Sequence, residues 1–187
     1  MDNQRQSYCS VAFSQVIFQA AVDVLGQPEA AKLLLQDNGC MAPDDLIDSL
    51  VQRYGVCGGR GIAQRMGRAA FKYFLDLYGD ELNLTGIDFR LMPTGRRLQA
   101  GLEIVSRKLS EECGAQINLD ADSSAYYWLI LWQRETGDQV GQHDFAYFLA
   151  GMAQELMSWS GGGKYYIVRE IPDSGRCVLK IDQNPLD

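Results

Sequence analysis

The sequence contains little of what metal-binding, nucleic-acid-binding and membrane-spanning proteins need. Its five cysteines include no C-x-x-C pair, and His143 is the single histidine, so no ready ligand set for structural zinc exists. No apolar run reaches the roughly 18 residues of a membrane span. The net charge of −7 argues against a protein that neutralises nucleic-acid phosphates. We therefore expect no nucleic-acid partner and no transmembrane segment.

The sequence also lacks the patterns that mark secreted proteins. The polar residues 1–7 lack the basic-then-apolar pattern of a secretory signal peptide. The odd number of widely scattered cysteines is typical of reduced thiols. The sequence therefore predicts a cytoplasmic protein.

Catalytic motifs are equally scarce, and we expect a protein that is not an enzyme. The glycine-dense residues 57–61 complete neither nucleotide-binding glycine pattern, which favours a loop or helix start over a phosphate site. A Ser-His or Cys-His mechanism would depend on His143. This residue precedes an expected helix, so we favour a polar helix-start role over a haem-ligand role.

Apolar residues are abundant, at 47% of 187 residues, which is enough for the core of one domain. Helical spacing predicts helices near residues 8–25, 28–36, 43–54, 62–77 and 93–113, and again at 145–159. Residues 55–61 look flexible. The apolar residues 125–132 predict a central strand covered on both sides, and 165–170 with 177–181 predict a hairpin. The expected fold is α+β, with N-terminal helices packed on a small twisted antiparallel sheet.

The helix at residues 8–25 is apolar almost all the way round. Such a helix is buried either in the core or against another subunit. We therefore expect one domain, 1–187, in which residues 1–55 form a helical part that mediates homodimerisation.

Three groups of side chains are candidates for a site. Tyr and Trp residues at 126–128, 132 and 165–166 suit either a plain core or a pocket for a flat molecule. The basic residues Arg60, Arg65, Arg68 and Lys72 form either a solvated helix face or a contact for ligand carboxylates. Glu170, Asp173 and Cys177 are weak metal-ligand candidates, because they are a ligand short of a zinc site.

The C-terminal segment carries a family resemblance. It consists of the helix 145–156 (FAYFLAGMAQEL), Gly161–Gly163, the strand 165–170 ending in Glu170, Gly175, and the strand 177–181 led by Cys177. This order resembles the 4-vinyl reductase domain over roughly 60 residues, and more loosely over the rest, where residues 61–77 are similar to the family's upstream helix.

The resemblance implies an α+β fold shared with TRAPP vesicle-tethering subunits and haem-based nitric-oxide sensors, with a hydrophobic pocket between helices and sheet. It assigns residues 56–187 to the ligand-binding part. Family members bind aromatic hydrocarbons or belong to tetrapyrrole-linked proteins of phototrophs. Several hold zinc, but here Asp173 replaces one of the cysteines, so we expect that site to be lost while Glu170 and Cys177 still match.

The leading hypothesis is non-catalytic binding of a flat hydrophobic molecule, plausibly a tetrapyrrole such as a chlorophyll precursor or bilin, in pigment metabolism or photosynthetic assembly. The expected pocket residues are Arg65, Met66, Arg68, Tyr73, Phe74, Tyr126, Trp128, Trp132, Phe148 and Met152. The alternative is a dimeric scaffold that resembles the TRAPP subunits, has a filled pocket and joins partners in an assembly complex. A further alternative is a vinyl reductase that uses an external electron donor.

Overall fold

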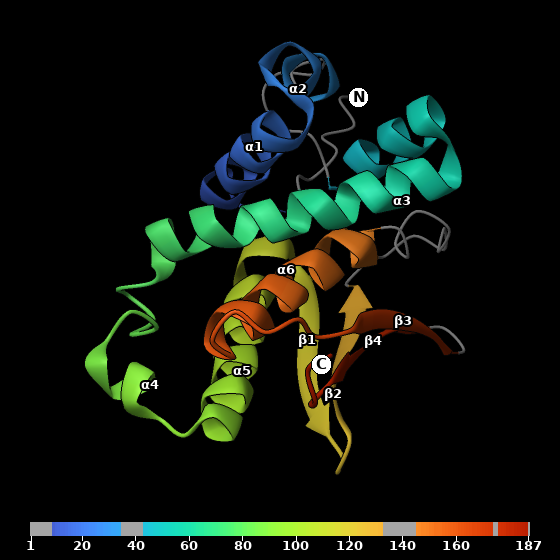
Figure 1. Cartoon of the computed structure of the whole chain (residues 1–187). Coiled ribbons are helices and arrows are strands. Elements are labelled where there is room, and N and C mark those ends of the chain that lie inside the picture. The colour runs from blue at the N-terminus through green and yellow to red at the C-terminus, as the bar shows by residue number, and fades with distance from the viewer. Residues whose placement is uncertain (1–8, 35–42, 133–144, 174–175, 187) are drawn as a thin grey trace.

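The computed structural model describes residues 9–34, 43–132, 145–173 and 176–186 (Figure 1). His143 and the turn of the C-terminal hairpin at 174–175 lie outside the described residues. In chain order the elements are α1 (Val11–Leu25), α2 (Gln27–Leu34), α3 (Pro43–Tyr78), α4 (Ile87–Leu91), α5 (Thr94–Cys113), β1 (Ala115–Ala121), β2 (Ala125–Trp132), α6 (Phe145–Ser160), β3 (Val168–Asp173) and β4 (Arg176–Asp182).

The elements form layers. In Figure 1, α1 and α2 lie above the long helix α3, and α6 crosses beneath α3 on the side of the sheet. The four strands pair antiparallel in the order β1-β2-β4-β3. The α+β architecture expected from the sequence is therefore confirmed, with helices packed on a small antiparallel sheet and a C-terminal helix and hairpin.

One face of the sheet packs against the helices. Along β2, Trp128 and Ile130 are buried, whereas Tyr127 and Leu129 on the other face are only half-buried and Leu131 is 37% exposed. The prediction that this strand is covered on both sides was therefore wrong. An antiparallel sheet needs only one covered face, and large apolar residues on the other face can shield one another.

Helix α1 is buried mainly inside the chain itself. Its side chains Phe13, Ile17 and Ala20 are buried, and α1 packs against α3. Ser10 caps its first turn, where the hydroxyl accepts a hydrogen bond from the Phe13 N–H at 3.1 Å. Dimerisation through this segment stays a prediction, as does the division of the domain at residue 55.

Helix α3 contains a sharp bend rather than a loop. Gly55 has φ 74° and ψ 166°, a conformation that favours glycine, and the helix resumes directly after it. The prediction of a flexible segment at 55–61 was wrong, because those residues form the first turns after the bend. At Gly59 an added Cβ would lie 2.7 Å from the Val51 nitrogen, so glycine lets the segments of α3 before and after the bend approach closely.

No helix among the described residues combines the length and the apolar character that crossing a membrane requires.

Candidate functional site

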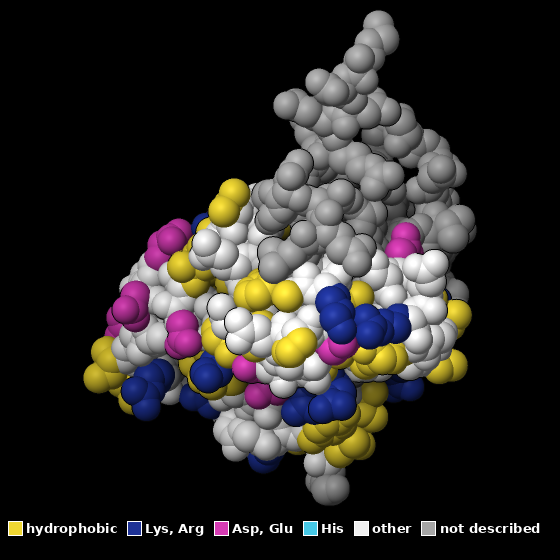
Figure 2. Space-filling model, turned by 90° about the horizontal axis from the view of Figure 1, so that it is seen from above, with side chains coloured by type: hydrophobic (Ala, Val, Ile, Leu, Met, Phe, Trp, Pro, Cys, Tyr) yellow, Lys and Arg dark blue, Asp and Glu magenta, His cyan; other side chains and the backbone are white. Residues whose placement is uncertain are grey.

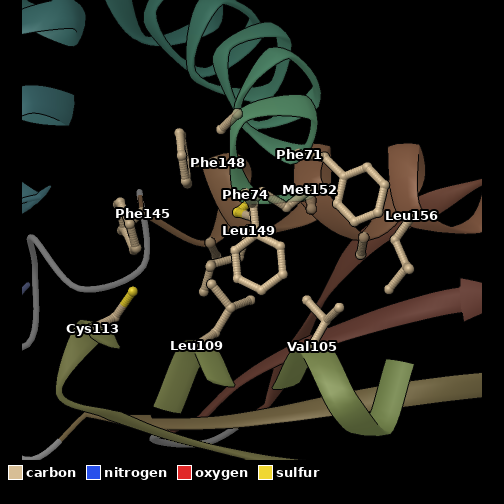
Figure 3. Close-up of a cluster of buried hydrophobic side chains, with 14 of the residues drawn as sticks. Phe71, Phe74, Val105, Leu109, Cys113, Phe145, Phe148, Leu149, Met152 and Leu156 are labelled. Atoms are coloured by element: carbon tan, nitrogen blue, oxygen red, sulfur yellow. The ribbon is translucent and has the colours of Figure 1, made fainter. Parts of the chain in front are cut away.

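Side chains from three helices converge on one buried volume (Figure 3). The ring of Phe74 lies beside Leu149 of α6 and above Leu109 of α5. The residues that surround it are all buried: Phe71, Val105, Cys113, Phe145, Phe148, Met152 and Leu156. This volume, bounded by α3, α5 and α6, is called the aromatic core below. It is the part of the described structure richest in phenylalanine.

The rings of the aromatic core contact one another. Phe145 and Phe148 stack with centroids 5.1 Å apart and planes 15° from parallel. Phe13 of α1 meets Phe148 edge-on at 6.4 Å. Phe71 and Phe74 lie 6.4 Å apart and nearly parallel. These are the spacings of favourable aromatic pairs, so the rings stabilise the fold as they stand.

Two glycines bring α3 and α6 into backbone contact. A Cβ added at Gly67 would lie 1.9 Å from the carbonyl oxygen of Phe148, and one at Gly151 would lie 2.0 Å from the carbonyl oxygen of Gln64. The helices therefore touch at this crossing, and no ring can lie between them there. A ligand would have to sit beside the crossing, where the aromatic core meets α5.

The structure brings some of the expected pocket residues together. Met66 and Phe74 of α3, and Phe148 and Met152 of α6, are fully buried between these two helices and α5. Tyr126 and Trp128 lie on the buried face of β2. In Figure 1 the sheet lies on the other side of α6 from α3. The side chain of Trp132 lies outside the described residues. The expected residues therefore approach α6 from two sides and do not form one wall.

The expected cationic contacts point away from the interior. Arg65 and Arg68 are exposed, and the Arg68 Nε donates to Glu155 Oε2 of α6 at 3.2 Å. Tyr73 is half-buried, and its hydroxyl donates to Asp23 of α1 at 2.7 Å. On the face seen in Figure 2, basic side chains are interspersed with acidic ones. The basic residues therefore lie on a solvated helix face.

The indole of Trp128 is a buried polar group of the interior. Trp128 is fully buried, and its Nε1 has no hydrogen-bond partner among the described residues. Leaving such a donor unpaired costs free energy, so an acceptor that reached it would be favoured. Nearby on β2, burial raises the pKa of Tyr126, so this phenol is neutral at physiological pH. The Tyr126 hydroxyl already donates to the Gly95 carbonyl oxygen at 3.4 Å, so the donor that the inner face of the sheet offers is the Trp128 indole.

A polar junction joins α1, α3 and α5 at one end of the aromatic core. The Ser10 N–H donates to the Glu112 carbonyl at 2.8 Å, and the Ser10 hydroxyl donates to the Glu112 carboxylate. Lys108 lies 3.0 Å from the same carboxylate and 4.6 Å from the Tyr78 ring centroid. Burial acts to raise the pKa of Glu112, but the hydrogen bonds from Ser10 and Lys108 outweigh it and the net pKa is lowered.

We expect Glu112→Gln to lower the free energy of unfolding by about 1–3 kcal/mol at pH 7, because it removes a charged acceptor from a largely buried pair. The folded-state pKa of Glu112 lies below the ordinary value of 4.5, so its contribution is complete above pH 4.5 and is lost as the pH falls further. Urea denaturation of both proteins from pH 7 to pH 3 should show the difference shrinking below about pH 4.5.

The neighbouring Glu111→Gln is the matched control. Glu111 lies 3.5 Å from the same Lys108, but its side chain is 60% exposed, so we expect a loss below about 0.5 kcal/mol. Equal losses of the free energy of unfolding in Glu112→Gln and Glu111→Gln would show that Lys108 and Glu112 do not form a buried pair.

The weak metal candidates lie on adjacent strands. Cys177 is buried, and its pKa is raised to about 12, by burial and then by the charge of Glu170. A protonated thiol is a poor metal ligand. The side chain of Asp173 lies outside the described residues. Among the residues that are described, no group of three or more His, Cys, Asp or Glu side chains is arranged to hold a metal ion.

Comparison with known proteins identifies relatives by fold alone. No protein-family model matches the sequence. No curated protein matches it either. The 4-vinyl reductase resemblance therefore stays a prediction.

Solved structures of similar fold include H-NOX proteins, which match over almost the whole chain. An H-NOX protein from S. oneidensis in the Fe(II)NO state has a TM-score of 0.62 and 11% identity, covering 94% of this chain and 99% of its own. The unliganded Fe(II) H-NOX protein from K. algicida has a TM-score of 0.59 and 10% identity, covering 94% and 97%. An oxygen-binding H-NOX domain related to soluble guanylate cyclases has a TM-score of 0.56 and 13% identity, covering 91% and 93%. The expected similarity in fold to haem-based nitric-oxide sensors is thereby confirmed.

Proposed function

We propose that this chain is a non-catalytic binding module for a flat hydrophobic molecule of the tetrapyrrole class, acting in pigment metabolism or in the assembly of photosynthetic complexes. The observation that carries the proposal is a fold shared along almost its full length with H-NOX proteins, among them structures described in terms of haem and porphyrin distortion. The aromatic core supports it, because it lies between the helical layers of that fold.

The chemistry of the interior suits such a ligand. Aromatic and methionine side chains make polarisable contacts with a flat conjugated ring. Phe74, Phe148, Met66 and Met152 supply these groups. The unpaired Trp128 indole N–H would donate to a carbonyl or ring nitrogen of a ligand that reached the sheet. Binding would require the stacked phenylalanines to rotate apart.

Iron ligation fits less well. Haem iron is held in proteins by a histidine nitrogen, a cysteine thiolate, a tyrosine oxygen or a methionine sulfur paired with histidine. Within the ranges that the structure describes there is no histidine. Burial raises the pKa of the Cys113 thiol well above its usual value, and it raises that of Tyr78 to about 12. The described residues therefore fit a ring held by packing and do not fit iron-ligated haem.

Titration with protoporphyrin IX, biliverdin and haemin tests the proposal. We expect saturable one-to-one quenching of tryptophan fluorescence by at least one of these rings, with a dissociation constant in the micromolar range or below. Quenching should persist in Trp159→Phe, which removes a partly exposed indole, and should weaken in Trp128→Phe, which removes a buried one. Non-saturable quenching by all three rings would refute the function.

A second candidate is a scaffold whose interior is filled by its own side chains, and specific contacts favour it. The rings of the aromatic core already touch, and α3 and α6 meet backbone to backbone at Gly67 and Gly151. Such a protein would bind none of the three rings and would form a homodimer. Sedimentation velocity on the same samples therefore separates the two candidates.

A further inference from the structure

Two buried cysteines lie at the polar junction. Cys9 lies two residues before the first residue of α1, and Cys113 is the last residue of α5. Cys9 is 6% exposed and Cys113 is fully buried. In Figure 3 the sulfur of Cys113 points away from the axis of α5, toward Phe145. Cys113 also borders the aromatic core described above.

A backbone hydrogen bond fixes how far apart the two residues are. The Ser10 N–H donates to the Glu112 carbonyl oxygen at 2.8 Å. Only two covalent bonds separate the Ser10 nitrogen from the Cα of Cys9, and only three separate the Glu112 oxygen from the Cα of Cys113. Standard bond lengths therefore limit the separation of the two Cα atoms to about 8 Å, which leaves the roughly 4.4–6.8 Å range that disulfides span within reach.

The side chains turn toward each other as well. Burial raises the pKa of the Cys113 thiol, and a hydrogen bond with the Cys9 thiol raises it further. The two thiols therefore lie within hydrogen-bonding reach of each other. The two hydrogen bonds between Ser10 and Glu112, the neighbours of the two cysteines, hold the segments together.

We propose that Cys9 and Cys113 form an oxidation-dependent disulfide that fastens α1 to the end of α5. The oxidant is a peroxide. The Cys9 sulfur, which is the more accessible of the two, attacks one peroxide oxygen; the O–O bond breaks, and the departing oxygen leaves as water. The Cys113 sulfur then attacks the resulting sulfenic acid, the S–O bond breaks, and a second water leaves. Two thiols and one hydrogen peroxide thus give one disulfide and two waters.

The surroundings of the two thiols determine how fast the disulfide forms and how much it stabilises the fold. The thiolate is the reactive form, so the raised pKa of the Cys113 thiol makes the bond form slowly at neutral pH and faster at pH 9. The bond would close a loop of about a hundred residues, and long loops give the largest stabilisation. It would also hold Phe13 of α1 on Phe148 of the aromatic core.

The test uses the full chain with Cys40→Ser and Cys57→Ser, which removes the exposed thiol of Cys57 and the cysteine outside the described residues. After exposure to hydrogen peroxide, we expect the intact mass to fall by about 2 Da and non-reducing peptide mapping to join Cys9 to Cys113. The melting temperature should rise by about 5 °C or more and return on addition of dithiothreitol.

Three variants sharpen the result. Adding Cys177→Ser should leave the mass change intact, since that buried thiol lies on β4. Adding Cys9→Ser or Cys113→Ser should abolish it. Both thiols remaining open to alkylation after oxidation in denaturant-free buffer, or a bond from Cys9 to any other cysteine, would overturn the proposal. Peptide mapping of the protein with only Cys40→Ser and Cys57→Ser shows whether Cys9 and Cys113 are joined, even if a further serine variant fails to fold.

Discussion

Replacing Gly151 with alanine should cost about 3 kcal/mol or more of the free energy of unfolding, or prevent folding altogether. The new methyl group would lie 2.0 Å from the Gln64 carbonyl oxygen and 2.9 Å from the Arg68 backbone nitrogen. Both are backbone atoms of α3, so no side chain can rotate out of the way. The two helices would have to separate along their whole contact. Urea denaturation followed by circular dichroism measures the loss.

Gly61→Ala in the facing helix α3 is the matched control. Nothing lies within 4 Å of a Cβ at Gly61, and alanine is the better helix former. We expect this variant to be neutral or more stable by up to about 1 kcal/mol. Gly67→Ala, whose methyl would lie 1.9 Å from the Phe148 oxygen, should behave like Gly151→Ala. If Gly67→Ala and Gly151→Ala were both as stable as Gly61→Ala, the backbone contact between α3 and α6 would be contradicted.

Truncating Phe148 to alanine should cost about 3–5 kcal/mol. This ring is fully buried and touches Phe13 of α1 and Phe145 of α6, so its removal leaves a cavity at the centre of the aromatic core. Thermal and urea unfolding of the two proteins measure the change.

Tyr165→Ala is the control, because it removes an aromatic ring that is 48% exposed. We expect this substitution to lower the free energy of unfolding by less than about 1 kcal/mol. The Phe148→Ala variant also separates the two candidate functions. A binding module with extra space should take up protoporphyrin IX at least as tightly, whereas a scaffold should bind none. A loss for Phe148→Ala no larger than for Tyr165→Ala would mean that the ring is not a core contact.

Much of the fold could be predicted from the sequence because its pattern is local. The helical spacing that begins at residue 145 predicts a helix, and α6 spans Phe145–Ser160. The glycine after residue 113 predicts a helix end, and Gly114 has the left-handed conformation of a C-terminal cap. The hairpin prediction matches the pairing of β3 with β4.

Features that depend on contacts between distant segments could not be predicted. Glycine in a helix looks like a weakness in the sequence, so the pattern of residues 57–61 suggested flexibility, and nothing marked Gly67 and Gly151 as a contact pair. Both glycines are required by a neighbouring helix that is distant in the sequence. Such requirements become visible only when the helices are placed together.

The candidate site shows the same limit. Helical geometry places Arg68 about 200° around the axis from Met66, so the two side chains cannot line one pocket wall. The sequence grouped them because they are close in number, whereas the structure has Met66 buried and Arg68 exposed beside Glu155. The side of the sheet to which Trp128 belongs depends on strand register, which no local pattern determines.

The strand order also has a consequence for biosynthesis. β4 is made after β1, β2 and β3, yet it occupies an inner position in the sheet, between β2 and β3. Until it has been made, the apolar strand β2 can pair only with β1, and its other edge stays open. From the time β2 has been made until β4 follows, the nascent chain therefore exposes a row of unpaired backbone groups beside Trp128 and Ile130, a state that invites aggregation and chaperone capture.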